Sequence, residues 1–135
     1  MNRIDETFSA LKKAGRKALI PFLTGGFPSL SLSLKVSLEL AKRGADIIEI
    51  GVPFSDPIAD GPIIQASSQL ALAKGASLGR ILDLIGQFKG QCSTPIVLMS
   101  YYNPLLRSGI PNFMKEAQAA GVEPTVDMYP VLLKP

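Results

Sequence analysis

A short apolar run that ends in a proline constrains this chain more than any other feature. Residues 47–52 read Ile-Ile-Glu-Ile-Gly-Val, and Pro53 follows. A run this rich in β-branched residues predicts a strand that is buried on both faces, as in a parallel sheet. Glu49 interrupts the run, and poor hydration among apolar neighbours suits a carboxyl group that both gives and takes protons. Glu49 could equally lie at the solvent end of the strand or in a structural ion pair.

Two aspartates follow on the loop after this strand. Asp56 and Asp60 lie between Pro53 and Pro62, and Pro62 suits the first turn of a helix. Asp60 therefore has two explanations, because an aspartate before a helix can cap its free N–H groups or can take part in acid–base chemistry. A carboxylate in the strand and another on the following loop favour a divided acid–base task. The catalytic candidates are Glu49 and Asp60.

Composition limits the alternatives. The chain has 135 residues, 47% of them hydrophobic and 19% charged, which predicts one globular domain over residues 1–135. There is no histidine, so Ser-His-Asp and Cys-His chemistry and the usual zinc ligand sets are excluded, and no metal site is expected. Cys92 is the only cysteine and cannot form a disulfide within the chain.

Charge and hydropathy give the expected location. The formal net charge is +3, and the one basic cluster, at residues 12–17, is explained by a solvated helix face. No aromatic residues interleave with it, so nucleic-acid binding is not expected. No apolar stretch approaches the ~18 residues that cross a bilayer, and the first residues lack a hydrophobic signal core. We therefore expect a cytoplasmic protein without a membrane segment.

The remaining pattern alternates strands with helices. Strands are expected at 18–24, 47–52 and 95–100, with a short fourth strand at 122–130. Helices are expected at 3–14, 62–74, 78–88 and 111–120. A further helix is expected to begin at a cap, Ser29 or Ser31, and to end at Gly44. This order predicts βαβ units and a parallel sheet. A doubly wound sheet would often show a Gly-x-Gly-x-x-Gly turn, which is absent, whereas a complete (β/α)8 barrel needs ~200 or more residues. In either fold, functional residues lie at the carboxyl ends of the strands.

Three motifs lie at these strand ends. They are Pro-Phe-Leu-Thr-Gly-Gly-Phe-Pro at 21–28, Gly-Ala-Asp-Ile-Ile-Glu-Ile-Gly-Val-Pro-Phe-Ser-Asp-Pro-Ile-Ala-Asp-Gly-Pro at 44–62, and Met-Ser-Tyr-Tyr-Asn-Pro at 99–104. With these motifs the chain resembles one family, the tryptophan synthase alpha chain, over residues 1 to about 122. The middle motif is long and specific. The resemblance implies an α/β fold, a partial (β/α)8 TIM barrel comprising roughly its first half, with three to four parallel strands and outer helices.

The resemblance also implies an activity and a set of site residues. The family splits indole-3-glycerol phosphate into indole and glyceraldehyde 3-phosphate, a retro-aldol reaction in tryptophan biosynthesis. Glu49 would transfer protons at indole C3 and at the glycerol hydroxyl, and Asp60 would take charge at the indole nitrogen. Phe22 and Tyr101 would line the indole pocket.

A partner is implied as well. The loop at 53–60 and the region at 103–104 resemble segments that contact the tryptophan synthase beta chain in an α2β2 tetramer, which makes Pro53, Asp56, Pro57 and Asn103 the expected partner-binding residues. Pyridoxal phosphate would belong to that beta chain, and this chain has no motif for it.

The chain departs from the family pattern after residue 122. We therefore expect residues 123–135 to form a divergent C-terminal tail in place of the second half of the barrel, which in the family carries the loops that hold the substrate phosphate. Open sheet edges would then favour self-association. The alternatives to a working lyase are an impaired half-barrel that only binds or modulates the beta chain, and a non-functional truncation product.

Overall fold

A three-stranded parallel sheet forms the centre of the chain. The computed structural model describes residues 2–123. Its strands are β1 (Phe22–Thr24), β2 (Ile48–Gly51) and β3 (Ile96–Met99), in the spatial order β1-β2-β3. Both neighbouring pairs are parallel, so each connection crosses over through at least one helix. This is the βαβ arrangement that the sequence predicts, although the expected fourth strand lies almost entirely outside the described residues.

β1 is shorter than the predicted strand at 18–24. The N–H group of Leu19 donates to the side chain of Asp46, at 2.8 Å from Oδ2, instead of to a neighbouring strand. Pro21 has no N–H to donate, although its carbonyl accepts from Glu49 N at 3.0 Å. The segment before Phe22 therefore runs beside β2 without forming a regular ladder.

The strand register divides the side chains into two faces. Leu23 is level with Ile50, and Ile50 with Leu98. Because successive side chains alternate, the next row, Phe22, Glu49 and Val97, points to the other face.

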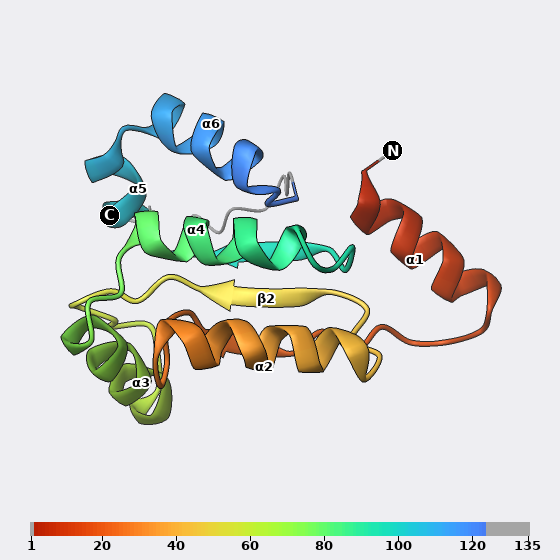
Figure 1. Ribbon diagram of the computed structural model, residues 1–135, viewed down its shortest axis with the longest axis horizontal. Coiled ribbons are helices and arrows are strands. Elements are labelled where there is room, and N and C mark those ends of the chain that lie inside the picture. The colour runs from red at the N-terminus through yellow and green to blue at the C-terminus, as the bar shows by residue number, and fades with distance from the viewer. Residues whose placement is uncertain (1, 124–135) are drawn as a thin grey trace.

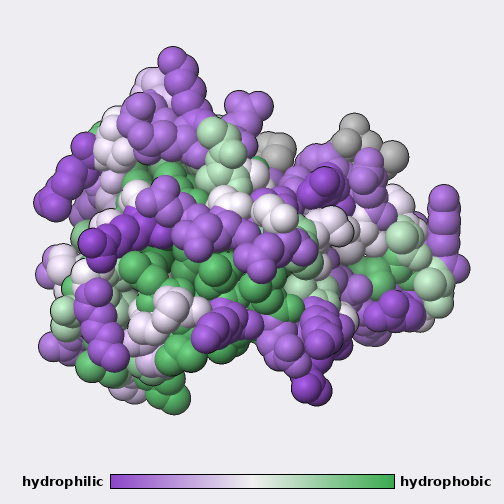
Figure 2. All heavy atoms as spheres, in the orientation of Figure 1, coloured by the Kyte–Doolittle hydropathy of each residue, from purple (hydrophilic) through white to green (hydrophobic). Residues whose placement is uncertain are grey.

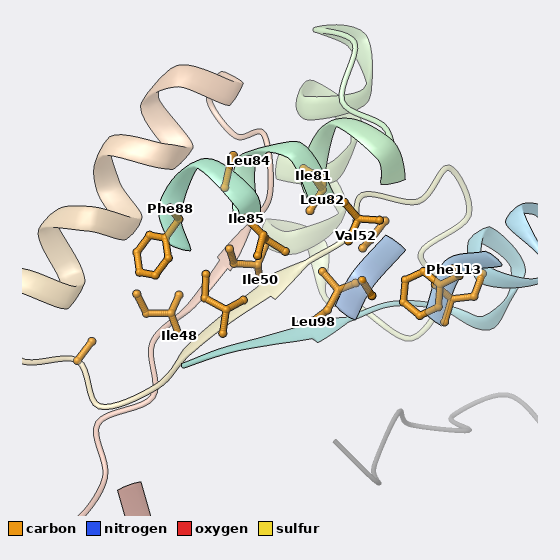
Figure 3. Close-up of a cluster of buried hydrophobic side chains, with 14 residues drawn as sticks. Ile48, Ile50, Val52, Ile81, Leu82, Leu84, Ile85, Phe88, Leu98 and Phe113 are labelled. Atoms are coloured by element: carbon orange, nitrogen blue, oxygen red, sulfur yellow. The ribbon is translucent and has the colours of Figure 1, made fainter. Parts of the chain in front are cut away.

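Two helices seal the first of these faces. They are α2 (Leu30–Lys42) and α4 (Leu78–Lys89), which lie side by side along the strands (Figure 1). Ser29 and Ser77 cap their first turns, each accepting a backbone N–H three residues ahead. Figure 3 shows the side chains of α4 above those of β2 and β3. The residues of this core with no exposed surface are Ile48, Ile50, Ile81, Ile85, Phe88 and Ile96.

The other helices lie around this unit. α1 (Arg3–Lys13) stands apart beside the amino ends of the strands, and α3 (Pro62–Ala73) lies near their carboxyl ends (Figure 1). α5 (Tyr102–Ser108) and α6 (Ile110–Ala120) follow β3, and α6 packs on α4. No helix within residues 2–123 is both long and apolar enough to cross a bilayer.

α5 was not predicted, because Pro104 made residues 101–104 read as a turn. Pro104 is the third residue of the helix, where its missing N–H has no intrahelical partner to lose. Tyr101 is the residue that precedes the helix, in extended conformation. The end of β3 therefore passes directly into a helix.

An apolar groove runs along the outer surface between α2 and α4, where Figure 2 shows hydrophobic atoms between hydrophilic ridges. Its floor is formed by Leu30, Leu34, Leu38 and Leu84, and charged side chains border it. It lies on the helix side of the sheet, whereas Glu49 is on the opposite side. We therefore place no candidate catalytic group in it.

Two isoleucines allow a direct test of this core. Ile85 of α4 has no exposed surface, whereas Ile63 of α3 is 81% exposed. We expect Ile85→Ala to lower the free energy of unfolding by about 2–5 kcal/mol, because it leaves a cavity under the sheet. Ile63→Ala should change it by less than about 0.5 kcal/mol. Urea unfolding followed by circular dichroism measures both, and equal effects would contradict the burial described above.

Candidate functional site

The sheet face opposite α2 and α4 carries the first candidate residue. Glu49 lies in the middle of β2, level with Phe22 of β1 and Val97 of β3. All three side chains are half-buried. Glu49 forms no salt bridge with any residue of the described part, so a structural ion pair does not account for it there. Its position is therefore a partly apolar sheet face with access to solvent.

The ring of Phe22 lies over Gly51, one strand away. A Cβ atom placed on Gly51 would lie 2.6 Å from Cζ and 2.8 Å from Cε2 of that ring, closer than real contacts allow. Glycine is required at this point because the ring occupies the space of a side chain. The Phe22 ring is thus held against β2 at Gly51, which is two residues from Glu49 along the strand.

Asp60 lies on the loop between β2 and α3 and does not cap the helix. The N-cap residue of α3 is Gly61, and no side chain accepts a bond there. Asp60 Oδ2 instead accepts a hydrogen bond of 2.9 Å from the hydroxyl of Tyr101, at the end of β3. Of the two explanations for Asp60, helix capping is wrong, and its carboxylate is directed toward the end of the neighbouring strand.

The rest of the loop is fixed by three further contacts. Ala59 N donates to the Tyr101 hydroxyl at 3.0 Å. Gln65 of α3 reaches back, and its Nε2 donates to the backbone oxygen of Asp60 at 2.9 Å. The rings of Phe54 and Tyr101 lie 5.1 Å apart, tilted by 33°. These contacts hold the backbone on both sides of the Asp60 carboxylate.

The hydroxyl of Tyr101 holds its proton more firmly than a free tyrosine. Burial raises its pKa above the ordinary value of 10.0, and the hydrogen bond to the Asp60 carboxylate raises it further. The N–H of Ala59, which favours the deprotonated form, acts in the opposite direction and is outweighed. Tyr101 is therefore a neutral hydrogen-bond donor at physiological pH.

A buried pair of hydroxyls links the first strand to α3. Thr24 Oγ1 and Ser67 Oγ lie 2.7 Å apart, and both residues are buried. Ser67 also donates to the carbonyl of Ile64 within the same helix, which leaves the Thr24 hydroxyl to donate to Ser67. The contact keeps the middle of α3 against the carboxyl end of β1.

The expected partner-binding residues differ in exposure. Asp56 and Asn103 are exposed, Pro57 is half-buried, and Pro53 is buried, so the side chain of Pro53 supports the loop from within. Ile58, which the sequence did not single out, is 76% exposed. An apolar side chain thus projects from the same loop that carries Asp60.

The structure brings some of the predicted residues together and leaves others apart. Asp60 meets Tyr101, and Glu49 shares a row with Phe22. No hydrogen bond joins Glu49 to Asp60 in the part of the chain that is described. No group of three or more acidic or cysteine side chains that could hold a metal ion occurs within residues 2–123.

Sequence reasoning missed two residues that support this site, Phe54 and Gln65. Phe54 could have been suggested by its place beside Pro53 in the specific middle motif. Gln65 is one turn into a helix that begins at Pro62, where a side chain can reach back to the preceding loop. The available sequence signal for Gln65 is a polar residue one turn after the start of a predicted helix.

Comparison with known proteins identifies related sequences. The family model described as tryptophan synthase alpha chain matches residues 8–128. The tryptophan synthase alpha chain of Laribacter hongkongensis is 50% identical over 133 residues, covering 96% of this chain and 50% of the relative. That of Geobacter sulfurreducens is 52% identical over 123 residues, covering 91% of this chain and 47% of the relative.

Solved structures give the same result for the fold. The tryptophan synthase alpha subunit of Legionella pneumophila superposes with a TM-score of 0.88 at 40% identity, covering 90% of this chain and 47% of that subunit. The predicted partial TIM barrel is confirmed. The chain spans about half the length of the curated relatives it matches.

The contact between Phe22 and Gly51 can be tested by a double-mutant cycle. Gly51→Ala should lower the free energy of unfolding by about 1–3 kcal/mol, because the new methyl group displaces the Phe22 ring. In a Phe22→Ala background the same change should cost less by at least about 0.5 kcal/mol, since the ring is gone. Strictly additive effects in chemical denaturation would show that the two residues do not collide.

Proposed function

This chain belongs to the tryptophan synthase alpha chain family, and we propose that it carries the proton-transfer residues of a lyase that cleaves indole-3-glycerol phosphate into indole and glyceraldehyde 3-phosphate. The observation that carries the proposal is the separation of two carboxylates into different surroundings. Glu49 lies beside apolar side chains on the sheet face opposite α2 and α4, and Asp60 lies on a fixed loop with a hydroxyl donor. Environments that differ in this way suit two different roles.

Glu49 has the proton-transfer role. Cleavage begins when a proton is added to C3 of the indole ring, which leaves positive charge on the ring nitrogen. The hydroxyl on the adjoining carbon then loses its proton, its electron pair forms the carbonyl of the aldehyde, and the electrons of the broken carbon–carbon bond return to the ring. One carboxyl group next to both atoms can give the first proton and take the second. Phe22, level with Glu49, supplies an apolar wall for the indole ring.

Asp60 has the electrostatic role. The positive charge that develops on the ring nitrogen is stabilised by a carboxylate that accepts the N–H hydrogen bond. A carboxylate already held in place has little reorganisation to make when the charge appears. The hydrogen bond from Tyr101 and the bond from Gln65 to the Asp60 backbone supply that restraint.

The proton-transfer role predicts a specific loss of activity. Glu49→Gln keeps the shape of the side chain but removes its exchangeable acid proton, so indole release from indole-3-glycerol phosphate should fall about 10²- to 10⁴-fold. Because the chain contains no tryptophan, the appearance of indole can be followed by fluorescence against a low background.

Glu116→Gln is the matched control. Glu116 is an exposed glutamate on α6, and within residues 2–123 its side chain is bonded only to Asn112, one turn away. Its amide variant should release indole at the unmodified rate. Equal rates for the Glu49→Gln variant and the unmodified chain would remove Glu49 from the mechanism.

A second function, binding of a tryptophan synthase beta chain, is favoured by the exposure of Ile58. Apolar side chains that project from a surface with polar neighbours are typical of protein contact sites. Ile58 and the exposed carboxylate of Asp56 stand on one loop, and Asn103 is also exposed, in the first turn of α5. Binding through this surface does not require catalysis, so the chain could modulate a beta chain even as an impaired lyase.

This second function predicts that a charge at position 58 disrupts the complex. Ile58→Asp should weaken binding to a purified beta chain about tenfold or more in sedimentation velocity, because the charge would be buried without a partner. Leu32→Asp is the control, since Leu32 is 46% exposed on α2, away from the loop. If both variants, or neither, lose binding, the loop is not the contact surface.

A further inference from the structure

The Tyr101 hydroxyl has only one arrangement of its hydrogen bonds. The Ala59 N–H can only donate, so at 3.0 Å the Tyr101 oxygen must accept from it. The single proton of the hydroxyl is then free to point at Asp60 Oδ2, 2.9 Å away, and an ionised carboxylate can only accept. Three groups thus form a chain in one direction, from Ala59 N–H through the Tyr101 hydroxyl to the Asp60 carboxylate. Each bond polarises the next and strengthens it.

This chain holds one carboxylate oxygen and leaves the other available. Oδ2 accepts from Tyr101, and Oδ1 has no partner among the described residues. The Asp60 backbone is restrained on both sides, by Ala59 N–H and by the Gln65 amide. With the backbone and Oδ2 fixed, the direction of Oδ1 is fixed too.

We propose that Tyr101 is a positioning residue that aims the free Oδ1 of Asp60 at the ring N–H of an indole ligand. This inference rests on the proposed function, because it assigns Asp60 to the ring nitrogen. It differs from the expectation that Tyr101 only lines the indole pocket, since its hydroxyl acts through Asp60 and not on the ligand. The ring of Tyr101, which packs against the Phe54 ring at a tilt of 33°, keeps the hydroxyl in place.

The protonation of Tyr101 supports this role. Burial and the Asp60 carboxylate both raise the pKa of the hydroxyl above 10.0, so the donor keeps its proton throughout the neutral range. Because the pKa of Tyr101 is raised in the folded state, its protonated hydroxyl adds stability to the fold. This added stability is complete below pH 10 and is lost as the pH rises through the folded-state pKa. The Tyr101 hydroxyl therefore remains able to donate to Asp60 at neutral pH.

The first test compares two ligands that differ at the ring nitrogen. Indole has an N–H donor and 1-methylindole has none, and both can be titrated by their own fluorescence because the chain has no tryptophan. Tyr101→Phe removes the hydroxyl and keeps the ring beside Phe54. We expect indole binding to weaken about tenfold and 1-methylindole binding to change less than about twofold. The matched control is Tyr102→Phe, since Tyr102 is 40% exposed in the next position; it should leave both ligands unaffected.

A purely structural or lining role for Tyr101 predicts a different outcome. Loss of pocket shape would weaken both ligands equally, and an equal loss would overturn the inference. A loss of indole binding alone, with the preference for indole over 1-methylindole abolished, would support it. Circular dichroism of the Tyr101→Phe variant establishes that it is folded.

The second test needs no ligand. In Asp60→Asn the acceptor loses its charge, so the pKa of Tyr101 should fall toward 10.0. An alkaline titration followed by tyrosine absorbance measures this pKa. The same titration of Tyr101→Phe identifies which part of the signal belongs to Tyr101. An unchanged titration would overturn the inference whether or not indole binds. If the tyrosine pKa falls as expected but the unmodified chain binds no indole, the hydrogen bond between Tyr101 and Asp60 is supported and the proposed function is contradicted. A failure of this inference can therefore be distinguished from a failure of the proposed function.

Discussion

Burial of Ile48 and Ile50 under α4 determines where Glu49 can be. In a strand, neighbouring side chains point to opposite faces, so two isoleucines without exposed surface force the residue between them to the other side. Fully burying each isoleucine contributes about 1.5–3 kcal/mol. A one-residue slip would place the Glu49 carboxylate under α4 and both isoleucines on the opposite face, losing that burial and leaving a charge without a partner. The hydrophobic core thus selects the face on which the proposed acid–base group lies.

The position of Asp60 depends on a different constraint, the register of two parallel strands. β2 and β3 end at the same edge, since Gly51 is level with Met99. The loop after β2 and the segment that follows β3 are therefore neighbours in space, and Tyr101 can reach a carboxylate 41 residues away in the sequence. The core places Glu49, and the strand ends place Asp60.

These two constraints differ in how much the sequence reveals. β2, α2 and α4 could be predicted because their apolar patterns and the caps Ser29 and Ser77 are local signals. The bond between Asp60 and Tyr101 could not, because it depends on strand register and on the path of the loop. α5 was missed for a related reason, since Pro104 is compatible both with a turn and with a first helical turn. Local patterns therefore predicted the elements, and tertiary pairing assembled the candidate site.

The loop at residues 52–61 serves both proposed functions at once. Ile58, exposed to solvent, is two residues from Asp60, and the intervening Ala59 N–H is bonded to the Tyr101 hydroxyl. A partner that binds Ile58 and moves this backbone would also move the Asp60 carboxylate, because the Gln65 and Tyr101 bonds connect the same few residues. By linkage, a ligand that fixes the Asp60 side of the loop must then change partner affinity by the same factor as the partner changes ligand affinity. This loop therefore connects the proposed indole site with the proposed beta-chain surface.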